Sequence, residues 1–501
     1  MPSTLALPPV YTPRQISDFL VSGYWEQEGT PVHAFVLGSD NAISVNLSGV
    51  SLAQKSTARL ALEAWTATTG IRFTEVSSGG EIKLTSSNAY EAKSSVTFSG
   101  NITKSSTITV GDPWAEQYGY GLGSYTLQTW IHEIGHSLGL GHAGNYDGSS
   151  TYADGALYAN DSWQMTVMSY FSQWENTYID ADYAFVMTPM LADMMAVRDI
   201  YGVVAPLRAG NSTYGNNADT GDYYQKLQPL LGEVSWTIVD SGGMDTLDIS
   251  GDRTGARIDL RPGGISDAWG MVGNLLIDVT TIVEKVVGGS GADWVLGNDA
   301  NNSLIGDQGD DSLIGGMGRD TLRGGAGNDS LDGGNANDSL SGDTQNDSLS
   351  GGNGNDILLG SSGDDHLWGG FGNDTIDGGR GRDMLRGGDG NDYLKGSAGR
   401  DILIGGNGDD VMSGGADADS FIFNFCTEKN HDRVVDFDAD GGDRIALDDG
   451  LWTGRLTADQ VVDRFCTIEQ DSAFFRFDDL NTLRLDGISD LDQLYGRIDL
   501  F

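Results

Sequence analysis

Three of the six histidines of the chain lie within eleven residues, in the stretch His132-Glu-Ile-Gly-His-Ser-Leu-Gly-Leu-Gly-His142. Histidines four residues apart lie on the same side of a helix, so His132 and His136 can reach one ion together. Gly139 allows the helix to end, and His142 then approaches from outside it. Three neutral imidazoles with one open position indicate a catalytic zinc rather than a closed structural site. We predict that these histidines bind one Zn²⁺.

Glu133 directly follows the first of these histidines and is predicted to face the open side of the metal. There it can take a proton from a water molecule, because zinc lowers the pKa of such a water to about 7. The alternative is an ordinary amphipathic helix that carries histidines by chance. Gly139 and His142 argue against that alternative, because each meets a separate geometric need.

A second signal follows at Val167-Met168-Ser169-Tyr170. Together with the zinc motif, this stretch resembles the methionine turn of the metzincin metalloproteases. In having a tyrosine two places after the methionine, the chain resembles the serralysin and astacin families. The resemblance implies that Met168 forms an apolar floor beneath the histidines. It also implies that Tyr170 binds at the zinc and stabilises the oxyanion during catalysis. Taken alone, the two residues would be a core methionine and a half-buried phenol.

Periodicity predicts the elements that must position these residues. A helix is expected from Ser124 to Leu138, followed by the glycine-rich run that contains the third histidine. Another helix is expected from a capping box at Ser51 to Gly70. Ser94 to Ser99 is predicted as an edge strand that an extended substrate could join, although an ordinary surface strand is equally consistent. The remaining predicted elements are strands 71–76 and 81–85 and a helix over 190–201.

From Gly288 the chain follows a nine-residue period with aspartate at the sixth position and an apolar residue at the eighth. The sixth positions run from 293 to 419 in fourteen steps of nine, with Asn302 as the interruption. Six glycine-rich residues should form a turn and three a short strand. Carboxylate and carbonyl oxygens suit calcium. The predicted calcium ligands are Asp293, Asp311, Asp320, Asp329, Asp338, Asp347, Asp356, Asp365, Asp374, Asp383, Asp392, Asp401 and Asp410.

This period matches the RTX nonapeptide, and the resemblance implies a parallel β-roll that binds several calcium ions, with two nonapeptides in each coil. Facing rows of aspartate repel each other when calcium is absent. We therefore expect the array to be disordered in a calcium-poor cytosol and to fold outside the cell. A flexible Gly/Asp linker is the alternative, and the strict phase of the apolar position argues against it.

Composition restricts the partners. The chain has 501 residues, with 72 acidic and 29 basic residues and a net charge of −43, which argues against a nucleic-acid partner. It contains no apolar run of about 18 residues, so no membrane span is expected. The N-terminal stretch lacks the features of a Sec signal peptide. The two cysteines, Cys426 and Cys466, could form a disulfide or remain free thiols.

The resemblance to serralysins covers nearly the whole chain and implies an α+β metzincin-like catalytic domain followed by an all-β parallel β-roll (RTX) domain. The repeat array looks longer than is usual for that family, and the cysteine pair is unusual there. The predicted divisions are a zinc metalloprotease domain over 1–205 with a possible short prosegment within 1–20, a linker with roll-capping strands over 206–287, the calcium-binding roll over 288–423, and a C-terminal β region over 424–501.

The same resemblance implies a secreted monomer that a Gram-negative bacterium exports by a type I machine, through a C-terminal signal that ends at Arg497-Ile-Asp-Leu-Phe501. The predicted function is a zinc endopeptidase acting on extracellular proteins or peptides. In it, Glu133 activates water and later protonates the leaving amine. The alternatives are a calcium-dependent binding or adhesion protein and a hydrolase of non-protein amides.

Overall fold

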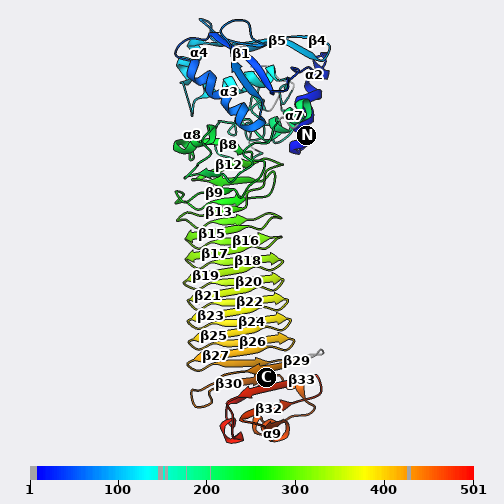
Figure 1. Ribbon diagram of the computed structural model, residues 1–501, viewed down its shortest axis with the longest axis vertical. Helices are drawn as coiled ribbons and strands as arrows, with labels where there is room; N and C mark the ends of the chain where they lie inside the picture. Colours follow the sequence, from blue (N-terminus) through cyan, green and yellow to red (C-terminus); the bar gives the residue numbers. More distant parts are fainter. Residues whose placement is uncertain (1–7, 145–149, 153–155, 177, 203–204, 426–429) are drawn as a thin grey trace, which may run out of the picture. The chain divides into compact units, whose positions relative to one another are not determined.

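The protein is described here by a computed structural model that covers residues 8–144, 150–152, 156–176, 178–202, 205–425 and 430–501. The chain divides into two compact units. The first comprises the described parts of Met1–Ile249 together with Arg257–Val283, and the second comprises Ser250–Ala256 with the described parts of Glu284–Phe501. In chain order an α+β unit precedes a parallel β-roll, which is the predicted fold class (Figure 1).

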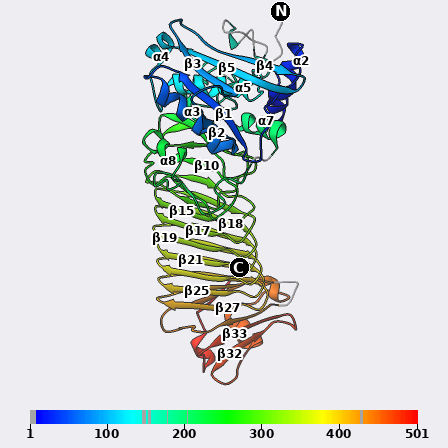
Figure 2. The ribbon, with the colours of Figure 1, turned by 45° about the horizontal axis from the view of Figure 1, so that its top comes forward.

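The first unit begins with a five-stranded sheet in the order β2-β1-β3-β5-β4. Its strands pair in parallel except for β4, which runs antiparallel to β5 at the edge (Figure 2). This confirms the predicted edge strand, which begins two residues earlier than expected. The strands are β1 Ala42–Gly49, β2 Arg72–Glu75, β3 Ile82–Ser87, β4 Ala92–Ser99 and β5 Ile102–Gly111.

Two long helices, α3 (Lys55–Thr69) and α5 (Tyr125–Ser137), pack against each other. The indole Nε1 of Trp65 on α3 donates a hydrogen bond of 2.9 Å to the carbonyl oxygen of Ile131 on α5. Gly70 ends α3 in the left-handed conformation with φ of 74°, as predicted. This contact fixes the helix that carries the first two histidines.

The predicted capping box at Ser51 is wrong. The residue that precedes α3 is Gln54, and its side chain makes no capping hydrogen bond. The hydroxyl of Ser51 donates instead to Oδ1 of Asp112 at 2.7 Å, and the side-chain amide of Gln54 also donates to that oxygen. A tertiary contact therefore replaces the local cap that the sequence pattern indicated.

Shorter helices complete the first unit. The predicted helix over 190–201 is present as α7, and Gly202 follows it. The remaining helices are α1 Pro13–Asp18, the π-helix Phe19–Gly23, α2 Tyr24–Gln27, α4 Asp112–Tyr118, α8 Tyr223–Leu227 and the 3₁₀ turn Gln228–Leu230, while α7 spans Leu191–Tyr201. None of the helices in the described parts of the chain has both the length and the apolar character that a membrane crossing requires.

Short strands follow α7 within the first unit. The strand β8 pairs in parallel with β6 and with β12, and β11 pairs antiparallel with β10 and β12. The strands β7 and β9 form a separate parallel pair. Their bounds are β6 Phe185–Val186, β7 Thr213–Gly215, β8 Val234–Ile238, β9 Thr246–Asp248, β10 Arg257–Asp259, β11 Ile265–Ala268 and β12 Met271–Ile277.

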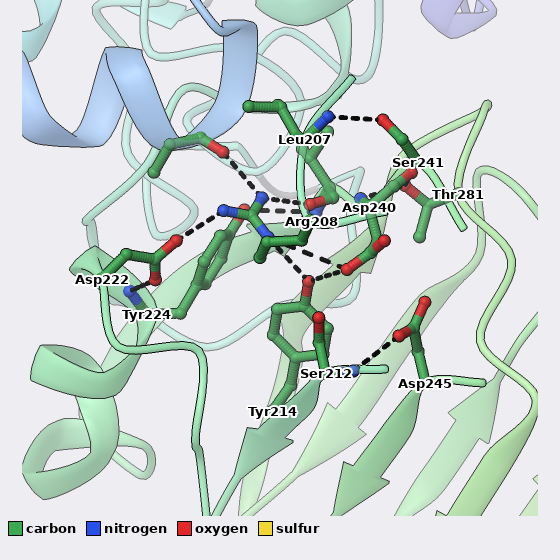
Figure 3. A network of polar contacts seen from close by, with 12 residues as sticks. Leu207, Arg208, Ser212, Tyr214, Asp222, Tyr224, Asp240, Ser241, Asp245 and Thr281 are labelled. Carbon is green, nitrogen blue, oxygen red and sulfur yellow. Dashed lines mark hydrogen bonds and ion pairs between the residues drawn. The ribbon is translucent and has the colours of Figure 1, made fainter. Parts of the chain in front are cut away.

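Arg208 joins this region to α3 (Figure 3). Its guanidinium donates hydrogen bonds to the carbonyl oxygen of Ala67 at 2.7 Å, to the hydroxyl of Tyr214 at 3.0 Å and to Oδ2 of Asp222 at 2.6 Å. It also lies over the ring of Tyr224, 4.7 Å from the centroid. A planar group with several donors can satisfy this many partners at once, so the segment after α7 is held against the helix that supports α5.

The second unit is a roll built from two stacks of parallel strands, which is visible in the green to orange part of Figure 1. Strands of one stack pair with a shift of eighteen residues, so that Leu313 lies opposite Leu331. This shift confirms that two nonapeptides form one coil. The orders within the unit are β34-β30-β28-β26-β24-β22-β20-β18-β16-β14 and β31-β32-β33-β29-β27-β25-β23-β21-β19-β17-β15-β13.

The strands of the roll are longer than expected. The predicted three residues are found in β13 and β14, whereas β15 to β27 have five or six, as in β18 Ser330–Asn335. Glycines at the start of one repeat lie opposite glycines of the next coil, as Gly334 does opposite Gly352, so pairing continues into the predicted turn. The apolar eighth positions from Val295 to Phe421 are all buried and form the core of the roll.

The strands of the roll proper are β13 Lys285–Val287, β14 Trp294–Leu296, β15 Ser303–Gln308, β16 Ser312–Gly316, β17 Thr321–Ala326, β18 Ser330–Asn335, β19 Ser339–Thr344, β20 Ser348–Asn353, β21 Ile357–Ser362, β22 His366–Phe371, β23 Thr375–Arg380, β24 Met384–Asp389, β25 Tyr393–Ala398, β26 Ile402–Asn407, β27 Val411–Ala416 and β28 Ser420–Phe423.

The C-terminal part continues both stacks. Its elements are β29 Asn430–Val434, β30 Arg444–Leu447, the 3₁₀ turn Asp449–Leu451, α9 Ala458–Phe465, β31 Cys466–Ile468, β32 Ser472–Arg476, β33 Asn481–Asp486, the 3₁₀ turn Leu491–Gln493 and β34 Ile498–Leu500. Among the described residues, the thiol of Cys466 is buried and free. Cys426, the other half of the possible disulfide, lies outside the described residues.

Candidate active site

The helix α5 presents the first two histidines on one face. The side chain of Ser124 caps its N-terminus by accepting a hydrogen bond from the amide of Leu127, as the predicted start requires. After the helix, Gly139 has φ of 101°, and a Cβ there would lie 2.4 Å from the carbonyl oxygen of His33. Both the conformation and the lack of space demand glycine at this turn, which brings His142 back toward the helix.

The three histidines converge as predicted. One ligand nitrogen from each of His132, His136 and His142 lies within 4.8 Å of the other two. The Nε2 atoms of His136 and His142 are 3.0 Å apart. The Nδ1 atom of His132 lies 2.8 Å from the carbonyl oxygen of Val167, and that of His136 lies 2.9 Å from the carbonyl oxygen of Leu140. A carbonyl can only accept, so each Nδ1 carries the proton and each Nε2 offers its lone pair to the common point.

Burial keeps these imidazoles neutral. It lowers the pKa of His132 to about 4 and that of His136 to about 3, where the nearby His132 lowers it further. Burial also holds the pKa of His142 well below the ordinary value. Neutral imidazole is the form that binds a metal ion, so the donor set fits zinc at neutral pH.

Glu133 lies beside this cluster and is 7% exposed. Burial raises the pKa of its carboxyl to about 8, and a hydrogen bond from Ser94 on the edge strand β4 opposes that rise. Within the described part of the chain, its Oε2 atom is buried and has no hydrogen-bond partner. A carboxyl group with an unpartnered oxygen is therefore held between α5 and β4, and the positive charge of a bound metal ion would favour its carboxylate form.

Met168 and Tyr170 also meet the histidines. The sulfur of the fully buried Met168 lies 2.6 Å from the position that a Cβ on Gly135 would occupy, so the glycine allows the methionine to pack directly against α5. The ring of Tyr170 lies 5.7 Å from that of His132 and 4.5 Å from that of His142, measured between centroids. The structure thus brings together every residue that the sequence assigned to the zinc site.

The predicted calcium ligands form two rows in the second unit. In each row the Oδ1 atom of one aspartate accepts a hydrogen bond from the backbone amide eighteen residues earlier, as Asp329 does from Asp311 at 2.9 Å. Each is 3% exposed or less. Among the described residues, the Oδ2 atom is buried without a partner in Asp311, Asp320, Asp329, Asp338, Asp347, Asp356, Asp365, Asp374, Asp383, Asp392, Asp401, Asp410 and Asp419.

These orphaned oxygens fit a hard cation, because a buried carboxylate oxygen without a donor is costly unless a positive charge lies beside it. Burial raises the pKa of Asp347 to about 7, and the facing Asp329 and Asp365 raise it further. Asp293 differs from the rest of its row. One of its oxygens accepts from the amide of Ala256 at 2.7 Å and the other from the amide of Gly289 at 2.9 Å.

Comparison with known proteins assigns the family. The profile described as Peptidase M10 serralysin C terminal matches residues 204–492, which is more than half of the chain. The chain belongs to the serralysin C-terminal family. A second profile, Peptidase M66, matches residues 75–178, which include the three histidines.

Similar proteins carry related names. The chain is 37% identical over 272 residues to a serralysin from Proteus mirabilis, which covers 50% of this chain and 55% of that protein. It is 33% identical over 285 residues to the metallopeptidase AprA of Pseudomonas marginalis, covering 53% and 60% respectively. A serralysin from Photorhabdus luminescens is 35% identical over 264 residues, covering 50% and 53%. The chain therefore spans about half the length of the curated relatives it matches.

One residue that supports the zinc site of this serralysin-family chain was not predicted from the sequence. Asp193 on α7 is fully buried and accepts hydrogen bonds from the hydroxyl of Thr166, from the amide of Val167 at 2.8 Å and from the amide of Met190 at 2.8 Å. The carbonyl of Val167 in turn accepts from His132. Asp193 thus fixes the turn that orients a histidine. An aspartate in the first turn of a helix gives no sequence signal for this role.

Two further members of the aspartate rows were also missed. Asp432 accepts from the amide of Asp410 at 3.1 Å, and Asp443 accepts from the amide of Asp419 at 2.9 Å. Their spacings of 22 and 24 residues break the period of eighteen and hide them. A sequence signal that could have found both is the order aspartate, any residue, apolar residue, which occupies positions six to eight of each repeat. This order recurs in Asp432-Arg-Val434 and in Asp443-Arg-Ile445.

Proposed function

We propose that this chain is a secreted zinc endopeptidase that hydrolyses peptide bonds in extracellular proteins. The observation that carries the proposal is the convergence of three neutral imidazoles beside Glu133, a buried carboxylate with an unpartnered oxygen. The names of the related proteins support the same reaction class.

His132, His136 and His142 would hold the zinc ion, with Tyr170 as a further ligand. When bound, zinc supplies a Lewis acid that polarises a carbonyl and makes water a nucleophile at neutral pH. Glu133 takes the proton of the attacking water and passes it to the leaving amine. The hydroxyl of Tyr170 donates to the oxyanion. The free edge of β4 pairs with the backbone of an extended substrate, in the manner of an added strand.

The Glu133→Gln variant tests the role of the base. It keeps the size of the side chain but cannot accept the proton, so casein hydrolysis should fall by about 10²- to 10⁴-fold while zinc content stays at the wild-type level. Glu116→Gln, at an exposed carboxylate of α4, is the matched control and should change neither quantity. Retained hydrolysis by the Glu133→Gln variant would contradict the proposed role.

The second unit is proposed to bind several calcium ions through the aspartate rows, which would include Asp293 at the start. The orphaned Oδ2 atoms support this proposal. Without calcium the facing carboxylates repel each other, so the roll should order only at extracellular calcium concentrations. Such an array suits export of an unfolded monomer through a type I secretion machine, the route that the resemblance to serralysins implies.

A further inference from the structure

A cavity of about 400 Å³ opens beside the zinc site toward the first turn of α5. Its described lining includes His132, Glu133 and Tyr170 at one end. Farther away it is lined by Tyr125, Trp163 and Glu175. The reaction proposed above uses the first end of this cavity and leaves the second without a role.

The far end of the cavity lies at some distance from the metal. Tyr125, Gln128 and His132 are spaced at three and four residues, so they share one face of α5. Seven residues of helix correspond to about 10 Å. A substrate side chain that fills the cavity must therefore be long.

The walls of the far end are aromatic. The ring of Tyr125 lies 5.5 Å from that of Trp163 and 5.9 Å from that of Trp114, measured between centroids. Aromatic faces attract cations and also cover the aliphatic stems of long basic side chains.

Glu175 supplies a negative charge at this end. One oxygen of its carboxylate, Oε2, accepts hydrogen bonds of 2.8 Å from the amide and from the hydroxyl of Ser172. Glu175 and Tyr125 line the same cavity, so the carboxylate and the aromatic ring face one space. Among the described residues that line the cavity, the charged groups are Glu133 and Glu175, and neither lysine nor arginine is present.

The edge strand indicates which substrate residue faces the cavity. Ala92, at the start of β4, lines both this cavity and a second one, whereas Phe98, near the end of β4, lines the second cavity, together with His136 and His142, and not the first. Antiparallel pairing is the more stable arrangement for an added strand. A substrate antiparallel to β4 therefore runs from the Phe98 end to the Ala92 end. The residue after the scissile bond then points into the aromatic cavity.

We propose, resting on the proposed endopeptidase function, that Glu175 selects substrates with lysine or arginine directly after the scissile bond. The stem of such a side chain packs against the adjoining rings of Tyr125 and Trp163, and its cationic head pairs with the Glu175 carboxylate. An apolar side chain of the same length would make the wall contacts but would form no ion pair with that carboxylate, which is exposed and keeps its hydrogen bonds from Ser172.

Quenched fluorescent peptides that differ only at this position, with lysine, arginine, norleucine or phenylalanine, test the proposal. For the wild type, kcat/KM for lysine should exceed that for norleucine by about three- to fivefold, because the carboxylate of Glu175 is exposed. In Glu175→Gln the ratio should fall to about one, because kcat/KM for the lysine peptide falls. Glu116→Gln removes an equal charge outside the cavity and should keep the wild-type ratio.

Equal kcat/KM for lysine and norleucine in the wild type, a preference for phenylalanine, or an unchanged ratio in Glu175→Gln would each overturn the proposal. Casein hydrolysis separates its failure from that of the proposed function. If casein is cleaved but kcat/KM is the same for the lysine and norleucine peptides, only the role of Glu175 is wrong. If zinc-loaded wild type cleaves nothing, the endopeptidase function is wrong. Binding of the lysine and norleucine peptides by the wild type, measured by fluorescence anisotropy, then decides the preference, and equal affinity overturns it.

Discussion

At the scale of single residues, the zinc site depends on groups that never touch the metal. His132 is oriented by the carbonyl of Val167, and the amide of the same residue is held by the buried carboxylate of Asp193. Partners of this kind fix the tautomer and the direction of the lone pair. The geometry of the first histidine is therefore set by a residue on α7, sixty-one positions later in the chain.

Replacing Asp193 by asparagine should loosen this arrangement. An asparagine side chain can accept through one atom only, so one or more of the buried donors of Thr166, Val167 and Met190 loses its acceptor. The free energy of unfolding should fall by about 1–3 kcal/mol. Zinc affinity should fall by about 10- to 100-fold. Urea unfolding and a zinc titration against a competing chelator measure the two effects.

Asp199→Asn is the matched control for this prediction. Asp199 lies on the same helix, is partly exposed and pairs with the exposed Arg14. Surface ion pairs contribute little to stability, so this variant should behave like the wild type. Wild-type zinc affinity in the Asp193→Asn variant would show that the turn needs no such support.

The metal ligands and the base could be predicted because their spacing along one helix and one turn determines where their side chains lie relative to one another. Glu175 and Asp193 could not, because each acquires its role only when distant segments fold together. Asp193 receives partners from the methionine turn, and Glu175 lines one cavity with Tyr125 although the two are fifty residues apart in the chain. Neither relation leaves a periodic mark in the sequence.

At the scale of elements, the register of the roll places the proposed calcium ligands in rows. Because strands pair eighteen residues apart, each aspartate lies next to the equivalent residue of the following coil. The start of the array differs from the rest. At Asn302 the turn contains an internal hydrogen bond, in which the side-chain Oδ1 accepts from the backbone amide of Asn298 at 2.8 Å. At Asp293, both carboxylate oxygens accept from backbone amides. We expect calcium binding to contribute less to the folding of these first turns than to the folding of the later coils.

Two aspartate variants compare these parts of the roll. In Asp347→Asn, the amide oxygen can still accept from the backbone, but one charged ligand is lost, so the calcium midpoint of folding should rise on the order of tenfold. In Asp293→Asn the midpoint should move less, because no oxygen that is free to bind calcium is lost, although one backbone amide loses its acceptor. Circular dichroism during a calcium titration measures both midpoints. Equal shifts, or strand content unaffected by chelator, would contradict the expected difference.

The sequence predicted the roll and its coil length because the repeat period is the structural period. It did not predict where strands begin and end. Glycine is normally unfavourable in strands, yet Gly334 pairs with Gly352 because every coil presents the same residue at the same place. The false cap at Ser51 has a similar origin, since its hydroxyl is taken by Asp112 from another part of the unit. Local rules fail where tertiary pairing offers a better partner.

At the scale of the whole molecule, each of the two units carries donor atoms that suit a different metal. The first unit holds a nitrogen donor set suited to zinc, and the second holds oxygen donors suited to calcium. The net charge of −43 is partly explained by the aspartate rows, which calcium would neutralise. Activity should therefore require both ions, zinc for the reaction and calcium for the folded state of the roll.

The most direct test is a zinc titration of the metal-free chain at saturating calcium, with casein cleavage and bound zinc measured in the same samples. Cleavage should be absent at the start, should rise with bound zinc, and should reach its plateau at one equivalent per chain, because one set of three imidazoles binds one ion. Cleavage before zinc is added, or no cleavage once the site is filled, would contradict the account.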